Sequence, residues 1–280
     1  MTGGTGNQGG AVAASLIKNG FKIKVLTRKP DSARARNLQK QNAELVKGDL
    51  NDLNTYRNHL NDLEGIFSVQ TFEKGVEKEM KQGTDLADLA KEFRVKHFIY
   101  SSVSGADLNT GIPHFDSKLK IENHIKQIGL PYTIIRPTSL FENFLLPQVK
   151  SRIVKGKLVS PVNRDKIQQF VGSVDIGEIS ADIFLNQDKY LEKTITIGAE
   201  EMDMQQVADI FSEVLGQEIK YQKLPMIITR LVMGKDLYKM FKWINGNDTV
   251  IIKDLTAFKK ENLNLTSLKQ WIKYNFKSIK

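Results

Sequence analysis

The sequence of 280 residues contains no cysteine, only two tryptophans and only four histidines. Without cysteine the protein forms neither disulfides nor metal–thiolate bonds, and it lacks a thiol nucleophile. It has no apolar run of about eighteen residues, which a membrane-spanning helix needs, and no basic-then-apolar signal pattern at its start. Its 40% hydrophobic and 26% charged residues are typical of a globular protein. We therefore expect a cytoplasmic protein with no bound metal and no membrane partner.

Acidic residues are scarce toward the C-terminus. Residues 218–280 contain 13 Lys and Arg but 5 Asp and Glu, so +8 of the net charge of +9 lies there. Such a surplus can mark a surface for a polyanion. Here the lysines are spread among apolar residues, as at Lys235, Lys239 and Lys242, which is typical of solvated helix faces. No recognition-helix or aromatic-stacking motif accompanies the charge, so we rank direct nucleic-acid binding last.

The most informative motif stands at the beginning of the sequence. Gly3, Gly6 and Gly9 give the spacing G-x-x-G-x-x-G, and a helix-like run with Val12 and Leu16 on one face follows. Glycine lets the backbone turn tightly and approach a pyrophosphate, which the N–H groups of the helix start then bind. Such a loop normally follows a buried strand, but only two residues precede it here. We expect the natural product to begin about six residues earlier, with a short apolar strand.

Short apolar segments alternate with helical patterns along the first half of the chain. We predict strands at 21–27, 43–47, 65–69, 97–101 and 132–135. This alternation predicts an α/β fold with a Rossmann-type doubly wound parallel sheet, whose first strand is missing or truncated.

The second half has a looser pattern. We predict a short strand at 194–197 and helices at 207–215 and 226–243, with core packing as the role of most Met and aromatic residues in 226–243. The predicted domains are a dinucleotide-binding Rossmann core, 1–143, and a smaller mixed α/β substrate- or partner-binding region, 144–280. The second packs on the core and returns some segments to the sheet.

Polar residues follow several predicted strands, at the edge where such sheets bind ligands. The first of these strands ends at Arg28 and Lys29, where an NAD site has an acidic residue for the ribose 2′-hydroxyl; two cations suit a 2′-phosphate, although a surface pair is the alternative. Asp49 follows the next strand, where it can bond adenine or cap the following segment. Gln70 and Thr71 follow the third.

A helix start carries the sequence His114-Phe-Asp-Ser-Lys118. Short-chain reductases place a tyrosine four residues before such a lysine, which bonds the nicotinamide ribose and lowers the pKa of the tyrosine for proton transfer. Here histidine replaces the tyrosine. His114 could transfer a proton, cap the helix or have no role. The expected contact of Lys118 with the ribose does not depend on which of these holds. The segment 139–143 follows a strand near the expected nicotinamide position, or is a loop that restarts as a helix.

These motifs resemble those of the NmrA-like family of atypical short-chain dehydrogenase/reductase proteins, over nearly the whole chain. The string His114-Phe-Asp-Ser-Lys118 resembles the NADP(H) redox-sensor branch of that family. Its further markers are Gly3-Gly-Thr-Gly-Asn-Gln-Gly9, Gly48-Asp49, Met80-Lys-Gln-Gly83, Asp85-Leu-Ala-Asp-Leu89, Phe141-Glu-Asn143 and Val174-Asp-Ile-Gly177.

The resemblance implies NADP(H) as the cofactor, with NADPH preferred over NADH. It implies a role for each of these residues: Gly3, Gly4, Thr5, Gly6, Asn7 and Gln8 at the pyrophosphate; Arg28, Lys29 and Ser32 at the 2′-phosphate; Asp49 and Leu50 at adenine; Lys81 near the cofactor; and Lys118, Leu140, Phe141, Glu142 and Asn143 around the nicotinamide.

Two functions follow from the sequence and the resemblance. The first is a regulator that senses NADP(H) and signals to a protein partner. The second is an NADPH-dependent oxidoreductase of a quinone or related carbonyl, with Lys118 or His114 as the proton source and catalytic residue. Absence of the tyrosine favours the first. Either function is compatible with a monomer or a homodimer.

Overall fold

The structure is a computed structural model that describes residues 1–261 and 265–277. The chain forms two compact units. Unit 1 comprises 1–109, 113–137 and 176–195, and unit 2 comprises 110–112, 138–175 and 196–280. The chain therefore passes between the units several times.

Unit 1 is built on parallel strands. A four-stranded sheet has the order β3 (Gly65–Ser68), β4 (His97–Ser101), β5 (Tyr132–Pro137) and β9 (Lys193–Ile197, which ends in unit 2). A parallel pair consists of β1 (Lys24–Thr27) and β2 (Glu44–Lys47). The pairs β3–β4 and β4–β5 are parallel too. The predicted α/β fold with a Rossmann-type parallel sheet is thus confirmed.

Met1 and Thr2 lie between β1 and β3. Met1 O accepts a hydrogen bond from Leu26 N, and Thr2 N donates to Phe67 O, both at 3.0 Å. Thr2 Oγ1 also bonds both backbone groups of Val69, at 3.0 and 2.8 Å. These two residues link the strand pair to the four-stranded sheet at the position expected for a first strand.

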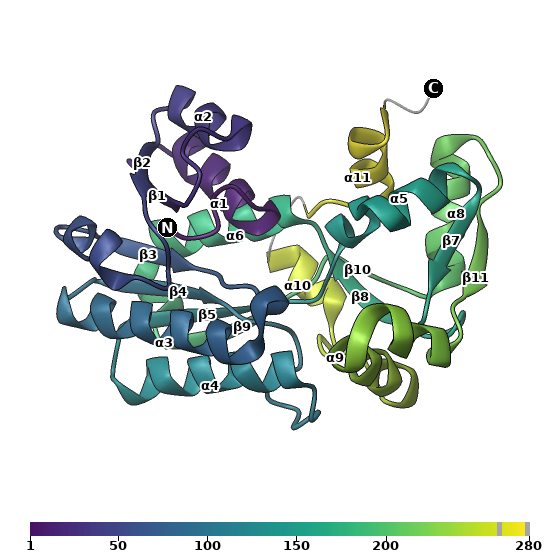
Figure 1. Ribbon diagram of the computed structural model, residues 1–280. Helices are drawn as coiled ribbons and strands as arrows, with labels where there is room; N and C mark the ends of the chain where they lie inside the picture. The colour runs from purple at the N-terminus through teal and green to yellow at the C-terminus, as the bar shows by residue number, and fades with distance from the viewer. Residues whose placement is uncertain (262–264, 278–280) are drawn as a thin grey trace. The chain divides into compact units, whose positions relative to one another are not determined.

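Helices cover both faces of this sheet (Figure 1). One face carries α3 (Val76–Glu92) and α4 (Pro113–Gln127), which pack on a core that includes Phe98, Tyr100, Ile121 and Ile134. The other carries α1 (Asn7–Lys18) and α6 (Ser173–Leu185, which begins in unit 2). A Cβ on Gly177 of α6 would lie 2.6 Å from Ala11 O, so glycine permits the close approach of these helices. The remaining elements of unit 1 are α2 (Ala33–Lys40), η1 (Leu53–Thr55), η2 (Arg57–Leu60), η3 (Phe72–Lys74) and α7 (Gln187–Tyr190).

The predicted strand at 21–27 is shorter in the structure and begins at Lys24. Phe21 N instead donates to Leu16 O and continues the end of α1, and Ile23 O accepts the first bond from Glu44 N. The other four predicted strands of this half are confirmed within two residues at each end. Ser32 caps α2 by accepting from Ala35 N at 3.3 Å.

Unit 2 contains a three-stranded sheet with the order β10 (Glu200–Met202), β8 (Gln168–Val171) and β6 (Ser139–Leu140). A second, parallel pair joins β7 (Lys157–Ser160) to β11 (Lys220–Lys223). Its core gathers aromatic rings, with Phe144, Phe211 and Trp271 among them. The surrounding helices are η4 (Phe141–Leu145), α5 (Pro147–Val154), α8 (Met204–Leu215), α9 (Met226–Gly246), α10 (Leu255–Glu261) and α11 (Leu268–Asn275).

The helix α9 is interrupted at Gly234, whose φ of +81° and ψ of 176° are not helical. Its second half packs Phe241 and Ile244 against the unit 2 core, as expected for aromatic residues of this segment. Its first half leaves Ile227 and Leu231 72% and 80% exposed, which the apolar pattern did not anticipate.

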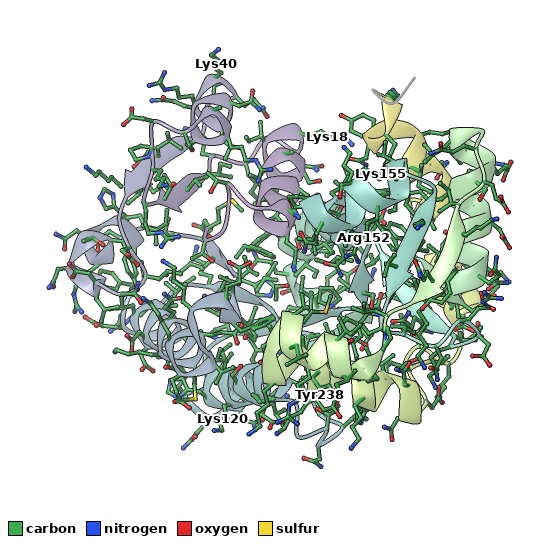
Figure 2. The ribbon with its side chains drawn as sticks, turned by 45° about the vertical axis from the view of Figure 1, so that its right-hand side comes forward. Lys18, Lys40, Lys120, Arg152, Lys155 and Tyr238 are labelled. Carbon is green, nitrogen blue, oxygen red and sulfur yellow. The ribbon has the colours of Figure 1, made fainter. Side chains whose placement is uncertain are left out.

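Charged side chains project from helices in both units. Lys40 and Lys120 extend outward from α2 and α4, and Arg152 from α5 (Figure 2). These exposed cations lie on separate helices. Lys235, Lys239 and Lys242 of α9 are exposed as well, as expected for a solvated helix face. No helix within residues 1–261 and 265–277 combines the length and apolar character needed to cross a bilayer.

Candidate cofactor site

The glycine loop has the conformation that its spacing predicts. Gly3 has a φ of +64°, a left-handed conformation that favours glycine, and Gly6 N closes the turn on Gly3 O at 2.8 Å. A Cβ on Gly9 would lie 2.3 Å from Gly3 O, so only glycine fits there. Helix α1 begins at Asn7 with Gly6 as its N-cap, which has no side chain to satisfy the N–H groups. Those donors are therefore oriented for an anion.

A cavity of about 490 Å³ opens beside this loop, at the C-terminal ends of β1, β2 and β3. Its volume lies within the range of about 300–1,000 Å³ usual for small-molecule sites. Nine of the predicted cofactor residues line it: Gly3, Thr5, Arg28, Lys29, Ser32, Asp49, Leu50, Gln70 and Thr71. Gly4 and Gly6 belong to the same loop, and Asn7 and Gln8 begin α1, but none of the four lines the cavity.

Positive charge dominates the cavity wall. It carries five cationic side chains, those of Arg28, Lys29, Arg34, Lys74 and Lys78, against two carboxylates. Of these five, the sequence alone predicts only Arg28 and Lys29 as cofactor residues. The others come from α2, η3 and α3, and only the folding of these elements around one cavity reveals them. Such a wall favours an anion with several charges.

Asp49 is one of the two carboxylates in this wall. The Asn51 backbone N–H donates to its Oδ1 at 3.0 Å and lowers the pKa of Asp49, and the charges of Arg28 and Lys78 act in the same direction. The cap of the following turn η1 is Asp52, not Asp49. Asp49 therefore stays ionised beside two cations, where an adenine amine is a suitable donor.

Two side-chain amides lie along the ends of the strands. Gln70 donates to Ser68 Oγ at 2.9 Å, and its buried Oε1 has no partner among the described residues. Gln8 accepts from Ser101 Oγ at 2.7 Å, which joins the first turn of α1 to the end of β4. Gln70, which lines the cavity, thus has a hydrogen-bond acceptor without a partner among the described residues.

Lys118 lies in α4 and is 8% exposed. Its Nζ forms an ion pair with Oε1 of the buried Glu79 at 2.9 Å. The angles of this contact do not meet those of a hydrogen bond. The Tyr100 ring centroid lies 5.8 Å from the same Nζ. Burial and the charges of Glu79 and Glu122 raise the pKa of Tyr100 well above its usual value, and its hydroxyl is in the core. Tyr100 is therefore no substitute for the tyrosine that precedes the reductase lysine.

His114 forms part of an aromatic cluster. Its ring stacks on Phe72, with centroids 4.2 Å apart and planes at 16°, and meets the edge of Phe115 at 5.0 Å. Phe72 begins η3, the turn that also supplies Glu73 and Lys74 to the cavity wall. His114 is thus 5% exposed and does not line the cavity.

The remaining predicted residues have other contacts. Lys81 forms an exposed ion pair with Asp85 at 2.7 Å and does not line the cavity. In unit 2, Phe141 is wholly buried, and the Glu142 carboxylate accepts from Ser173 N, Ser173 Oγ and Trp271 Nε1. Leu140 is half-buried and Asn143 is exposed. The cofactor roles predicted for Lys81 and Leu140–Asn143 stay predictions.

A second hollow of about 540 Å³ follows one continuous segment, 184–189. Phe184 packs near Gly65, at the opposite end of β3 from the glycine loop, so this hollow is remote from the predicted chemistry. Within residues 1–261 and 265–277, no three His, Asp or Glu side chains gather where they could hold a metal ion.

A family model described as the NmrA-like family matches residues 1–272. The chain belongs to the NmrA-like family. An oxidoreductase from Malbranchea aurantiaca, the NmrA-like family domain-containing malD, is 29% identical over 315 residues, covering 96% of this chain and 94% of that protein. The family resemblance is thus confirmed, and the assignment to the redox-sensor branch stays a prediction.

Solved structures share the fold. The NADPH-dependent quinone oxidoreductase QOR2 of Escherichia coli, complexed with NADPH, has a TM-score of 0.81 at 21% identity, with 98% of each chain covered. NmrA, a negative transcriptional regulator, in complex with NADP has a TM-score of 0.79 at 18% identity, with 99% of this chain and 94% of that chain covered. NmrA has also been solved with NAD. At these identities the likeness establishes the fold alone.

Proposed function

We propose that the protein binds NADP(H) in the cavity of unit 1 and acts as a regulator that responds to the bound cofactor. The observation that carries the first part is the cationic wall beside the glycine loop. The loop and the open N-terminus of α1 suit the pyrophosphate, and Arg28, Lys29 and Ser32 suit the 2′-phosphate. Asp49 and Leu50 would then contact the adenine.

The nicotinamide half is assigned to Lys118, through its proposed bond to the ribose hydroxyls. Bound NADPH supplies a hydride, but reduction of a carbonyl also needs a placed proton donor. His114 stands where short-chain reductases have the tyrosine, and the Tyr100 hydroxyl is in the core. This arrangement favours cofactor binding with regulation over carbonyl reduction.

The binding proposal is tested by replacing Arg28. In Arg28→Ala, we expect the affinity for NADPH to fall about tenfold to a hundredfold, because a charge-assisted contact to the 2′-phosphate is lost. The affinity for NADH, which has no 2′-phosphate, should change less than about threefold. Isothermal titration calorimetry of both cofactors measures the two affinities.

Lys40→Ala is the matched control for Arg28→Ala. Lys40 is an exposed cation at the end of α2 and does not line the cavity (Figure 2). It should leave both affinities unchanged, which separates a local phosphate contact from loss of general positive charge. Equal losses of NADPH and NADH affinity in Arg28→Ala would reject the 2′-phosphate role.

The second candidate function is an NADPH-dependent oxidoreductase of a quinone. The 29% identity to a relative named as an oxidoreductase favours it. Quinone reduction relies less on a protein acid than carbonyl reduction does. A panel of quinones with NADPH, followed by the absorbance of the reduced nicotinamide, separates the two functions. The enzyme function would be supported by turnover well above the protein-free rate that is lost in Lys118→Ala while NADPH still binds. That result would reject a regulator without catalytic activity. A regulator of redox state must instead bind NADP⁺ and NADPH with different affinities.

A further inference from the structure

A buried glutamate lies beside Lys118, and the glycine and lysine motifs do not predict it. Glu79 lies in α3 with no exposed surface, and its two carboxylate oxygens face α4. Oε2 accepts a hydrogen bond from Ser117 Oγ at 2.6 Å, and Oε1 lies 2.9 Å from Lys118 Nζ. Two consecutive residues of α4 therefore fix both oxygens of one carboxylate.

The ammonium group of Lys118 has a charged partner but no hydrogen-bond acceptor within the part of the chain that the structure describes. Glu79 compensates its charge, but the angles between Nζ and Oε1 do not meet those of a hydrogen bond. Among the described residues, no acceptor takes a hydrogen bond from Lys118 Nζ. Because an ammonium has three donors, a group that is buried and charge-compensated but lacks acceptors is prepared for a polar ligand.

We propose that Glu79 is a positioning residue, which holds the Lys118 ammonium in place to donate to the hydroxyls of the nicotinamide ribose. This inference rests on the proposed binding of NADP(H). A lysine side chain otherwise rotates about four bonds, and ordering it on ligand binding lowers affinity. An ion pair formed beforehand removes much of that loss.

A second buried pair in the same layer provides a comparison. Glu122 of α4 accepts from Arg136 Nε and Nη2 at 3.0 and 2.6 Å, and Arg136 also pairs with Asp107. The donors of this guanidinium that face Glu122 are consumed within the protein. The Glu122–Arg136 pair is thus a structural bridge between α4 and β5, whereas the Glu79–Lys118 pair keeps its donors for another group.

The test compares two ligands that differ in the nicotinamide half. NADPH carries the nicotinamide ribose, and 2′,5′-ADP lacks it while keeping the adenosine 2′-phosphate. In Glu79→Gln we expect about tenfold weaker binding of NADPH and a change of less than about twofold for 2′,5′-ADP, both by calorimetry. Lys118→Met should give the same selective loss. The double variant should lose no more than either single variant, because both substitutions remove one interaction.

Glu122→Gln is the matched control, since it disrupts the other buried pair. It should reduce thermal stability without changing the ratio of the two affinities. If Glu79→Gln does not fold, Glu79→Asp keeps the charge on a shorter side chain and should show a smaller loss, again for NADPH alone. Equal weakening of both ligands, or of neither, in the Glu79 variants would overturn the positioning role. A wild-type protein that binds neither ligand would instead reject the proposed function.

Discussion

At the scale of single residues, His97 shows how burial determines a protonation state. The ring has no exposed surface, and its Nε2 lies 2.7 Å from Thr133 Oγ1. The Thr133 hydroxyl donates to Tyr190 O, so it accepts from His97, and Nε2 carries the proton. Nδ1 has no partner among the described residues. Burial lowers the pKa of His97 to about 4, because a second proton would place an unpaired charge in the core.

This depressed pKa predicts a loss of stability in mild acid. The pKa of histidine in the unfolded chain is about 6.5, whereas burial keeps the pKa of His97 in the folded protein at about 4. The unfolded state therefore binds more protons over that window, and the free energy of unfolding should fall by about 2 kcal/mol between about pH 7 and pH 5. Urea unfolding at several pH values measures this loss.

The variant His97→Gln should remove this part of the pH dependence, although it lowers stability at neutral pH. His59→Gln is the control, because the side chain of His59 is 48% exposed. It should leave the acid dependence as it is in the wild-type protein. An unchanged pH profile in His97→Gln would show that other groups cause the acid sensitivity.

Individual site residues could be predicted where local sequence determines their position. Gly3 and Gly9 are required by backbone geometry within a few residues, and Ser32 caps the helix that follows it. Glu79 could not be predicted, because its partner Lys118 is thirty-nine positions away along the chain and only the packing of α3 on α4 joins them. The same holds for Lys78, which reaches the cavity from α3.

At the scale of elements, α8 and α9 differ in what their apolar residues do. Phe211 of α8 is wholly buried between Phe144 and Phe276, each at 5.3 Å between centroids. Leu231 of α9 is 80% exposed. Both helices have apolar residues at helical spacing, so periodicity alone does not separate them.

This difference predicts unequal responses to truncation. Phe211→Ala should lower the free energy of unfolding by about 3–5 kcal/mol, since it leaves a cavity in the aromatic core. Leu231→Ala should change it by less than about 0.5 kcal/mol, because little buried area is lost. Urea denaturation of both variants measures the contrast. A loss above about 1.5 kcal/mol for Leu231→Ala would mean that the first half of α9 is covered in solution.

The strands of unit 1 could be predicted because each is short, apolar and bounded by turn residues. Their order in the sheet could not be predicted, as β9 illustrates. The strand Lys193–Ile197 follows a region of mixed pattern, yet it pairs beside β5 in the main sheet. Pairing of strands separated by sixty residues depends on tertiary packing, which one sequence does not encode locally.

At the scale of the whole molecule, the two units have separate cores. The unit 1 core lies between the sheet and the helices α3 and α4, and the unit 2 core gathers the rings around Phe211 and Trp271. A ligand that binds only the folded protein stabilises that state by about 2.7 kcal/mol at a hundred times its dissociation constant. The segments that it contacts open less often, so hydrogen exchange with two ligands can report which segments each part of the cofactor contacts.

We expect 2′,5′-ADP and NADPH both to slow exchange in the unit 1 segments 3–9, 27–33 and 69–78, which hold the glycine loop and the cationic wall. Only NADPH should also slow exchange in 114–118 of α4, which holds Lys118, the residue proposed to bond the nicotinamide ribose. Equal protection of this segment by both ligands would place its response on the adenosine half of the cofactor. No protection of it by NADPH would remove Lys118 from the nicotinamide site.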